Sequence, residues 1–374
     1  MRQRRFLKGL AILLGLALVA AACGDDDDSE GGGGADTTEA DGGDGGAATD
    51  FQGCQVTDTG GVDDRSFNQT AFAGLEQAAD ELGFEADVLE SQAESDFAPN
   101  IQAFLDQGCN LIVTVGFLLG AATATAAEEN PDQNFAIVDY DFSIAAGDAA
   151  DDYDNVKELT FKTDEAAFLA GYVAAAMTET GTVGTYGGIN LPTVTIFMKG
   201  FQLGIEHYNE ENGTDVQLEG WDNAADDGLF TGDFENQANG RATTEQLLDD
   251  GADIILPVAG PVGLGTIEAI RARPDSNAKV IWVDTDGCVS VSDECDLFLT
   301  SVMKNMDVAV HDATVEAAEG EFEGGLYEGT LENEGVDIAP FNEFEDEVPQ
   351  EVKDAVEDLR QQIVDGEITT FPEG

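Results

Sequence analysis

The sequence predicts an α/β protein with two doubly wound lobes, each built on a parallel sheet that helices cover on both faces. From residue 51 onward, short runs rich in β-branched residues alternate with segments of helical periodicity. The run CNLIVTVG at 109–116 is almost continuously apolar, which is typical of a parallel strand buried on both faces. A hydrophilic stretch at 143–155 separates two such series, so the pattern indicates two lobes in one chain.

The first series starts with the strand GCQVTDT at 53–59 and continues with a helix at 66–82. The apolar residues of this helix recur on one face, and Gly83 is expected to end it. Ser66 and Gln69 have the spacing of a capping box, which places the expected helix start at Ser66. Further strands are expected at 84–91, 109–116 and 135–141, with helices through 100–108 and 122–130.

The second series continues the alternation over the rest of the chain. Strands are expected at VKELTF (156–161), TVGTYGG (182–188), VQLEGW (216–221), DIILPVAG (253–260), KVIWVDTD (279–286) and FLTSVMK (298–304). Helices are expected at 164–177, which is rich in small residues, and at the amphipathic segments 192–213 and 348–365. Ligands of doubly wound sheets bind beyond the carboxyl ends of the strands, so a site is expected in the loops that follow them.

The charge of the chain limits the partners that it could have. Its 374 residues include 77 Asp and Glu against 15 Lys and Arg, which gives a formal net charge of −62. Such a surface repels nucleic acids and anionic lipid headgroups, so no nucleic-acid partner is expected. The acid excess suits solubility in high salt, although a genome-wide acidic bias would produce the same composition.

The first 50 residues have the composition of an export signal followed by a tether. Basic residues precede an apolar run at 9–22 that is too short to span a bilayer, so residues 1–22 are expected to be a signal peptide. The sequence VAAACG at 19–24 suits lipoprotein processing with a lipid on Cys23; the alternative is an ordinary signal peptide with an incidental cysteine. The acidic, glycine-rich segment at 23–50 predicts a disordered tether that holds a globular domain outside a membrane.

Four further cysteines fit an oxidising compartment outside the cell. Cys288 and Cys295 flank a short loop, so we expect them to form a disulfide. Cys54 and Cys109 begin two expected strands, and they can pair if those strands are neighbours in the sheet. None of the four has metal-ligand spacing, so no metal site is expected.

The stretch TDTGGVDDRSFNQT at 57–70 joins an expected strand to an expected helix. It lacks the glycine pattern of a dinucleotide-binding turn and the lysine of a P-loop, and its acids would repel a phosphate. The acids are also not placed as in a calcium loop. A pocket for a neutral ligand remains, in which the ring of Phe67 stacks on a flat heteroaromatic group and Asn68 offers a donor and an acceptor. The alternative is that Phe67 is only a hydrophobic staple of the helix.

No catalytic constellation is visible in the sequence. The two histidines, His207 and His311, lie in helical patterns far from strand ends. The motifs G-x-S-x-G and H-E-x-x-H are absent, and carboxylate pairs are too common in so acidic a chain to indicate a glycosidase. We therefore expect no catalytic residue and no cofactor.

Seven segments occur in an order that resembles one known family. They are VTDTGGVDDRSFNQTAFAGL (56–75), FLAGYVAAAM (168–177), GTVGTYGGINLPTV (181–194), GADIILPVAG (251–260), VIWVDTDG (280–287), TSVMKNMDVAV (300–310) and DEVPQEVKDAVEDLRQQIVDGEI (346–368). From about residue 54 to 370, the chain resembles the basic membrane protein (BMP) family of lipoproteins, which includes purine-nucleoside-binding proteins of ABC importers.

The resemblance implies the type I periplasmic-binding-protein fold, in which two α/β lobes are joined by a multi-strand hinge and close on the ligand. It places the N-terminal lobe at 51–163 and 288–319 and the C-terminal lobe at 164–287 and 320–374. Residues that match the family's base contacts are Phe67, Asn68, Asp164 and Phe234, with Trp221 and Phe230 as alternatives to Phe234. Residues that match its ribose contacts are Gly260, Asp286 and Lys304, with Asp284 as an alternative to Asp286. Asp58, at the end of the first strand, is expected to line the cleft.

The expected function is that of a lipid-anchored substrate-binding protein of an ABC importer, with a purine nucleoside as ligand. A nucleoside is favoured over a nucleotide because few cations are available for a phosphate. The expected partners are permease and ATPase subunits, and the lipid anchor is the expected contact with the membrane. The alternatives are a sugar or other small polar solute bound by the same fold, a surface sensor or adhesin without a transport role, and a nucleoside-cleaving enzyme.

Overall fold

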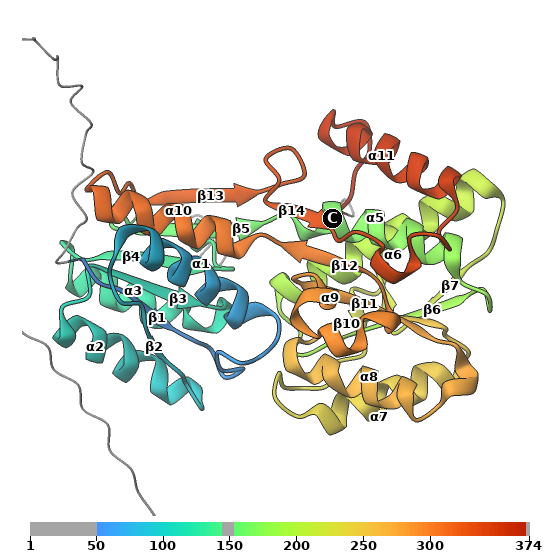
Figure 1. Cartoon of the computed structure of the whole chain (residues 1–374), viewed down its shortest axis with the longest axis horizontal. Helices are drawn as coiled ribbons and strands as arrows, with labels where there is room; N and C mark the ends of the chain where they lie inside the picture. Colours follow the sequence, from blue (N-terminus) through green and yellow to red (C-terminus); the bar gives the residue numbers. More distant parts are fainter. Residues whose placement is uncertain (1–50, 144–152, 372–374) are drawn as a thin grey trace, which may run out of the picture. The chain divides into compact units, whose positions relative to one another are not determined.

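The computed structural model describes residues 51–143 and 153–371, which contain two six-stranded sheets flanked by helices (Figure 1). The first sheet has the strand order β13-β5-β4-β3-β1-β2, and all its pairs are parallel. Its strands are β1 (Gly53–Val56), β2 (Asp87–Leu89), β3 (Leu111–Val115), β4 (Asn134–Val138), β5 (Val156–Phe161) and β13 (Gly325–Gly329). The helices of this lobe are α1 (Phe67–Leu82), α2 (Phe97–Gln107), α3 (Gly120–Glu129) and α10 (Met306–Glu319).

The second sheet has the order β14-β12-β11-β10-β6-β7, and it is parallel except for the β12–β14 pair. Its strands are β6 (Thr182–Gly187), β7 (Gln217–Glu219), β10 (Ile254–Val258), β11 (Lys279–Asp284), β12 (Phe298–Lys304) and β14 (Val336–Ile338). A small hairpin joins β8 (Trp221–Asp222) to β9 (Asp227–Gly228). The helices are α5 (Thr163–Met177), α6 (Pro192–Asn212), α7 (Gln237–Asp249), α8 (Leu264–Arg271), α9 (Gly287–Ser290) and α11 (Gln350–Val364). Short 3₁₀ turns lie at 94–96, 117–119, 260–263, 274–276, 292–297 and 342–344.

The apolar strand β3 is buried on both faces, as its sequence predicted. Val113 and Val115 pack in one apolar cluster with Leu75 of α1. Ile112 packs in a second cluster with Ile101 of α2. Alternate side chains of the strand therefore enter two different helix–sheet layers, which is why the strand needs apolar residues at successive positions.

Helices α5 and α6 touch through their small residues. A Cβ built on Gly204 of α6 would lie 2.0 Å from the carbonyl oxygen of Phe168, and one built on Gly200 would lie 2.3 Å from that of Asp164. Side chains at these positions would push the two helices apart. The close packing therefore fixes the first turn of α5, where Asp164 lies.

Helix α1 begins one residue after the expected start, and its cap differs from the expected capping box. Ser66 is the N-cap residue, but its hydroxyl makes no capping bond. The carboxyl group of Asp64 caps the helix instead, because its oxygens accept the backbone N–H groups of Ser66, Asn68 and Gln69 at 2.7–3.1 Å. The Ser66 hydroxyl donates to Asp284 of the second lobe.

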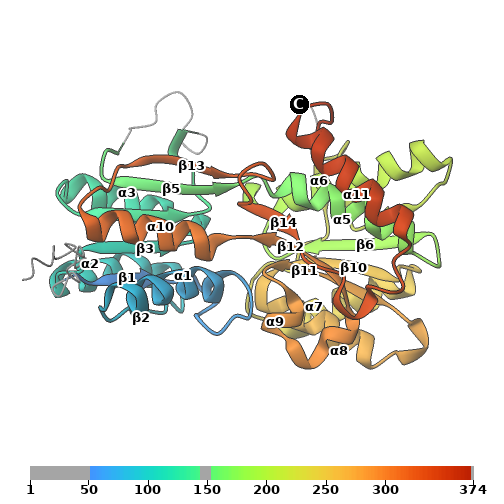
Figure 2. The ribbon, with the colours of Figure 1, turned by 45° about the horizontal axis from the view of Figure 1, so that its top comes forward.

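The described chain crosses between the two sheets at three places: between β5 and α5, between β12 and α10, and between β13 and β14 (Figure 2). These crossings form the multi-strand hinge that was predicted. The expected lobe boundaries after residue 287 are wrong, however. β12 pairs with β11, so 288–304 belong to the second lobe, whereas β13 pairs with β5 and belongs to the first. An apolar run in the sequence does not identify the strand with which it pairs.

Each lobe contains one disulfide, and both are pairings expected from the sequence. Cys54 of β1 is bonded to Cys109, just before the neighbouring strand β3, with Cα atoms 6.1 Å apart. Cys288 of α9 is bonded to Cys295, with Cα atoms 4.5 Å apart. Both separations are in the usual range for a disulfide.

The expected signal peptide, the lipidated Cys23 and the acidic tether lie outside the described residues. Most of the hydrophilic stretch at 143–155 lies outside them as well. Within 51–143 and 153–371, none of the helices combines the length and the apolar character that crossing a bilayer requires.

Candidate functional site

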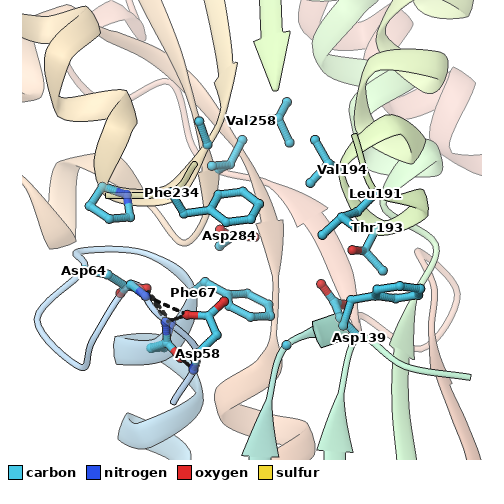
Figure 3. Close-up of a pocket in the computed structure, with 18 of the residues that line it drawn as sticks. Asp58, Asp64, Phe67, Asp139, Leu191, Thr193, Val194, Phe234, Val258 and Asp284 are labelled. Carbon is cyan, nitrogen blue, oxygen red and sulfur yellow. Dashed lines mark hydrogen bonds between the residues drawn. The ribbon is translucent and has the colours of Figure 1, made fainter. Parts of the chain in front are cut away.

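Residues at the carboxyl ends of strands in both sheets line one pocket, which we call the interlobe pocket (Figure 3). In the first sheet they follow β1, β3 and β4. In the second they follow β6 or lie at or just after the ends of β10, β11 and β12, and Phe234 joins them from the loop before α7. The pocket is partly open to solvent. Its place at the strand ends is where a doubly wound fold binds its ligand.

Two phenylalanine rings from different lobes line the interlobe pocket. Phe67 is the first residue of α1, and Phe234 lies in the loop before α7 (Figure 3). Gly188 makes room for the second ring, because a Cβ built there would lie 2.3 Å from Cε1 of Phe234. The alternatives Trp221 and Phe230 pack against each other in a T-shaped pair, with centroids 6.4 Å apart, and do not line the pocket. Phe234 is therefore the aromatic residue of this region that faces the pocket.

The side chain of Asn68 holds two carboxylates of the first lobe together. Its amide nitrogen donates to Asp58 Oδ1 at 2.7 Å and to Asp64 Oδ2 at 3.0 Å. Its oxygen accepts the backbone N–H of Asp58 at 3.3 Å. Both N–H bonds of the amide are thus used within the protein, so Asp58 is the member of this network with acceptor capacity left for a ligand.

One cation, Lys304, lies among the carboxylates of the interlobe pocket. From the end of β12, its ammonium forms an ion pair with Asp139 of the first lobe and lies 3.9 Å from Asp284 Oδ1. The three side chains are 3%, 8% and 9% exposed, respectively. Rings 5.0–5.9 Å from the ammonium are those of Phe67, Phe161 and Phe197. The buried ion pair therefore joins the two lobes inside an aromatic surround.

The carboxyl groups of the interlobe pocket are strongly desolvated. Burial raises the pKa of Asp64 to about 7, although the N–H groups that it accepts oppose the rise. Burial also raises the pKa of Asp58, again against the hydrogen bonds that it accepts. It raises the pKa values of Asp139 and Asp284, and the ammonium of Lys304 opposes both shifts. Four carboxyl groups and one ammonium suit a ligand that donates hydrogen bonds and disfavour an anion.

A second pocket, which we call the hinge-side pocket, adjoins the first at the Lys304–Asp139 pair. The residues common to both pockets are Phe117, Asp139, Thr193 and Lys304. The start of α5 contributes Asp164 to its wall. Burial raises the pKa of Asp164, and a hydrogen bond from Thr370 opposes the rise.

The structure brings most of the predicted site residues into these pockets. Those in the interlobe pocket are Asp58, Phe67, Asn68, Phe234, Gly260 and Lys304. Asp164 lines the hinge-side pocket instead. Asp286 lines neither: its carboxylate caps α9 by accepting the N–H of Cys288 at 2.8 Å, and it accepts the Asn342 amide at 3.2 Å. The expectation for Asp286 is therefore corrected, because Asp284 is the aspartate of this strand end that lines the pocket.

Asp139 and Phe197 also line the interlobe pocket, although neither was among the predicted site residues. A signal for Asp139 was present, because FAIVDYD and VIWVDTD both end in Val-Asp-x-Asp. The first aspartate of each motif, Asp139 or Asp284, has a left-handed backbone, with φ of 64° or 70°. Phe197 carried no comparable signal, because a phenylalanine on an amphipathic helix is expected in the core.

The two histidines lie outside both pockets. His207 of α6 packs against Phe168 with ring centroids 5.4 Å apart, and His311 of α10 lies between Glu81 and Asp312. In the part of the chain that the structure describes, no group of three or more His, Cys, Asp or Glu could hold a metal ion.

Two α/β lobes, a multi-strand hinge and a pocket at the facing strand ends are the architecture of type I periplasmic-binding-protein-like solute-binding proteins. The family of PnrA-like ABC transporter substrate-binding proteins, Bmp, matches residues 51–370. The chain belongs to this family, as its motifs suggested. Members are extracytoplasmic substrate-binding proteins of ABC transporters and are not enzymes.

Relatives from several organisms are similar over most of the chain. A CD4+ T-cell-stimulating antigen of Listeria innocua is 31% identical, and the match covers 98% of each chain. The ABC transporter nucleoside-binding protein BmpA of Lactococcus lactis is 32% identical over 88% of this chain and 92% of its own. An ABC transporter solute-binding protein from Aeropyrum pernix has a similar crystal structure, with a TM-score of 0.76 and 27% identity, covering 87% of this chain and 94% of that one.

Proposed function

We propose that the protein binds a purine nucleoside between its two lobes and delivers it to an ABC importer. The observation that carries the proposal is the pair of phenylalanine rings, Phe67 and Phe234, which line one pocket from opposite lobes. A flat base between two rings gains stacking energy of about 1–3 kcal/mol per base in other aromatic sites. Because each ring belongs to a different lobe, the same stacking would favour the closed arrangement.

The polar groups of the interlobe pocket are suited to the rest of a nucleoside. Carboxylates accept hydrogen bonds from sugar hydroxyls and from the N–H groups of a base. Asp284 and Lys304 are the candidates for the ribose, together with the backbone at Gly260, and Asp58 is the candidate for the base. A phosphate would face four carboxyl groups and one ammonium, so the nucleoside is favoured over the nucleotide.

Similarity supports the same ligand class. The Lactococcus lactis relative carries the name nucleoside-binding protein, and it is 32% identical over 88% of this chain. The family membership implies a permease and an ATPase as partners, and lobe closure would signal to them that the ligand is bound. We further propose that Cys23 carries a lipid and that the segment at 23–50 tethers the domain to the membrane, as the sequence around them favours.

The proposal is tested by a thermal-shift screen of the full chain in high salt, followed by calorimetric titration of the hits. The panel contains adenosine, guanosine, inosine, their free bases and monophosphates, and common sugars. A ligand that binds only the folded state raises the melting temperature. We expect shifts with nucleosides and none with monophosphates. A shift with a sugar alone would overturn the ligand class and leave the family unchanged.

A further inference from the structure

The described chain after α11 returns to the start of α5, and its last residues lie beside the hinge-side pocket. Thr370 is only 7% exposed, and its hydroxyl donates to Asp164 Oδ2 at 2.6 Å. The next residue, Phe371, lines the pocket, and the ammonium of Lys199 lies 5.0 Å from the centre of its ring. The C-terminal segment therefore contacts a carboxylate that itself faces a pocket.

Asp164 has unused capacity at this position. It lies in the first turn of α5, directly after the first hinge crossing, and it is 5% exposed. A carboxylate has about four acceptor positions, and the Thr370 hydroxyl and the backbone N–H of Asp164 itself occupy two of them. Asp164 can therefore accept a further donor from a molecule in the hinge-side pocket.

A second polar group at the same place points to a ligand. The Oγ1 atom of Thr163 is buried and has no hydrogen-bond partner among the described residues. Thr163 is fully buried and lines the hinge-side pocket next to Asp164. Buried hydroxyls without a partner are uncommon because they lose their hydration without compensation. Because this oxygen has almost no accessible surface, a bound molecule with a polar edge would supply the missing partner only after the hydroxyl of Thr163 turns toward the pocket.

We propose that Thr370 is a positioning residue for the ligand: its hydroxyl holds the carboxylate of Asp164 toward the hinge-side pocket, where that carboxylate accepts an N–H of the bound base. The inference rests on the proposed function, because it assumes a purine nucleoside that reaches from the interlobe pocket into the adjoining one. It assigns to the C-terminal segment a part in selecting bases that carry an N–H on the six-membered ring. A segment that merely ties down the chain end would not affect this choice.

The test is calorimetric titration of the full chain with inosine and with purine riboside. Inosine has an N–H on its six-membered ring, and purine riboside has none. Thr370→Val should weaken inosine binding at least tenfold and purine riboside binding less than threefold. Only inosine has the N–H that donates to the Asp164 carboxylate, so only inosine loses a hydrogen bond to a charged group when that carboxylate is no longer held in place. Thr370→Ser, which keeps the hydroxyl, should restore the wild-type preference. Thr369→Val, an exposed neighbour with the same chemical change, is the matched control.

Two results would overturn the inference while the wild type still binds nucleosides. One is an inosine affinity of Thr370→Val within threefold of the wild-type value. The other is an equal loss of affinity for inosine and purine riboside, which would mean that Thr370 only stabilises the packing of the C-terminal segment. Asp164→Asn gives an independent arm: it should lose the same preference, and adding Thr370→Val should cause no further loss. Additive losses would contradict positioning even if Thr370→Val alone folds poorly. A wild type that binds no nucleoside overturns the proposed function, and the inference with it.

Discussion

The hydroxyl of Ser66 donates to the carboxylate of Asp284 at 2.6 Å, which joins the start of α1 in the first lobe to the end of β11 in the second. Both residues are buried. The same hydroxyl lies 3.3 Å from the carbonyl oxygen of Val283. Asp284 also faces the interlobe pocket, so this bond holds a candidate ribose contact and links the lobes at once.

Ser66→Ala should therefore weaken ligand binding more than folding. The change removes the hydrogen bond between Ser66 and the Asp284 carboxylate. This bond joins the two lobes, so it can form only when the lobes face each other. Such a bond contributes about 1.5–3 kcal/mol, so we expect a loss of affinity of roughly tenfold or more. Calorimetric titration measures the affinity, and thermal unfolding of the ligand-free protein checks the fold. Ser95→Ala, at an exposed position, is the control, and equal affinities of the two variants would contradict a closing role for Ser66.

Phe67→Ala and Phe234→Ala should each reduce nucleoside affinity by about 1–3 kcal/mol, the usual effect of losing one stacking ring. Phe230→Ala offers a matched comparison, because Phe230 packs on Trp221 and does not line the pocket. That variant should lower the melting temperature and leave affinity near the wild-type value. The measurement is nucleoside titration of all three variants. Full affinity in Phe234→Ala would exclude a sandwiched base and would favour Phe67 as a one-sided contact.

Strand and helix positions could largely be predicted because their signals are local. The strand expected at 253–260 is β10 (Ile254–Val258), and the helix expected at 192–213 is α6 (Pro192–Asn212). β13 and β14 were missed because they are short and carry no long apolar run. Their sheet membership also depends on partners far away in the sequence: β13 pairs with β5, and β14 pairs with β12. The hydrophobic periodicity of a segment does not show which distant strand the segment pairs with.

The site residues also differ in whether local sequence or distant contacts determine their positions. The position of Phe67 and Asp58 at the pocket could be predicted, because residues between a strand and a helix lie at a strand end. The choice between Asp284 and Asp286 could not be made from sequence, because it depends on the backbone turn at residue 284, where φ is 70°. The bond between Ser66 and Asp284 joins residues 218 apart in the chain, so no local pattern could reveal it.

Lys304→Met should destabilise the protein by about 3–5 kcal/mol, because removing one partner leaves buried carboxylates without their cation. Adding Asp139→Asn should recover part of this loss, since it removes one of those carboxyl charges. Neither variant should bind ligand normally, because both residues line the interlobe pocket. Denaturant unfolding measures the stabilities. Arg241→Met, which breaks the half-exposed pair with Glu245 at 3.0 Å, is the control and should cost less than about 1 kcal/mol. A double variant no more stable than Lys304→Met would contradict the ion-pair explanation.

Asp64 should make folding stability depend on pH in the direction opposite to that of a carboxylate whose pKa is lowered by folding. Burial raises its pKa from 3.8 to about 7 in the folded state, so between these values the folded chain holds a proton that the unfolded chain has released. The contribution is fully present below about pH 4, falls by at most about 1.4 kcal/mol per pH unit, and is lost as the pH rises through 7.

Asp64→Asn removes this titration and keeps an oxygen that can accept the N–H groups at the start of α1. We therefore expect the unfolding free energy of the wild type, minus that of Asp64→Asn, to decrease from pH 4 to pH 7 and then to level off. Urea unfolding at constant high salt measures both proteins at each pH. Asp63→Asn, at the exposed neighbouring position, controls for the loss of one acidic group. A difference that increases with pH would mean that the hydrogen bonds accepted from Ser66, Asn68 and Gln69 outweigh burial, and that Asp64 caps α1 as a carboxylate.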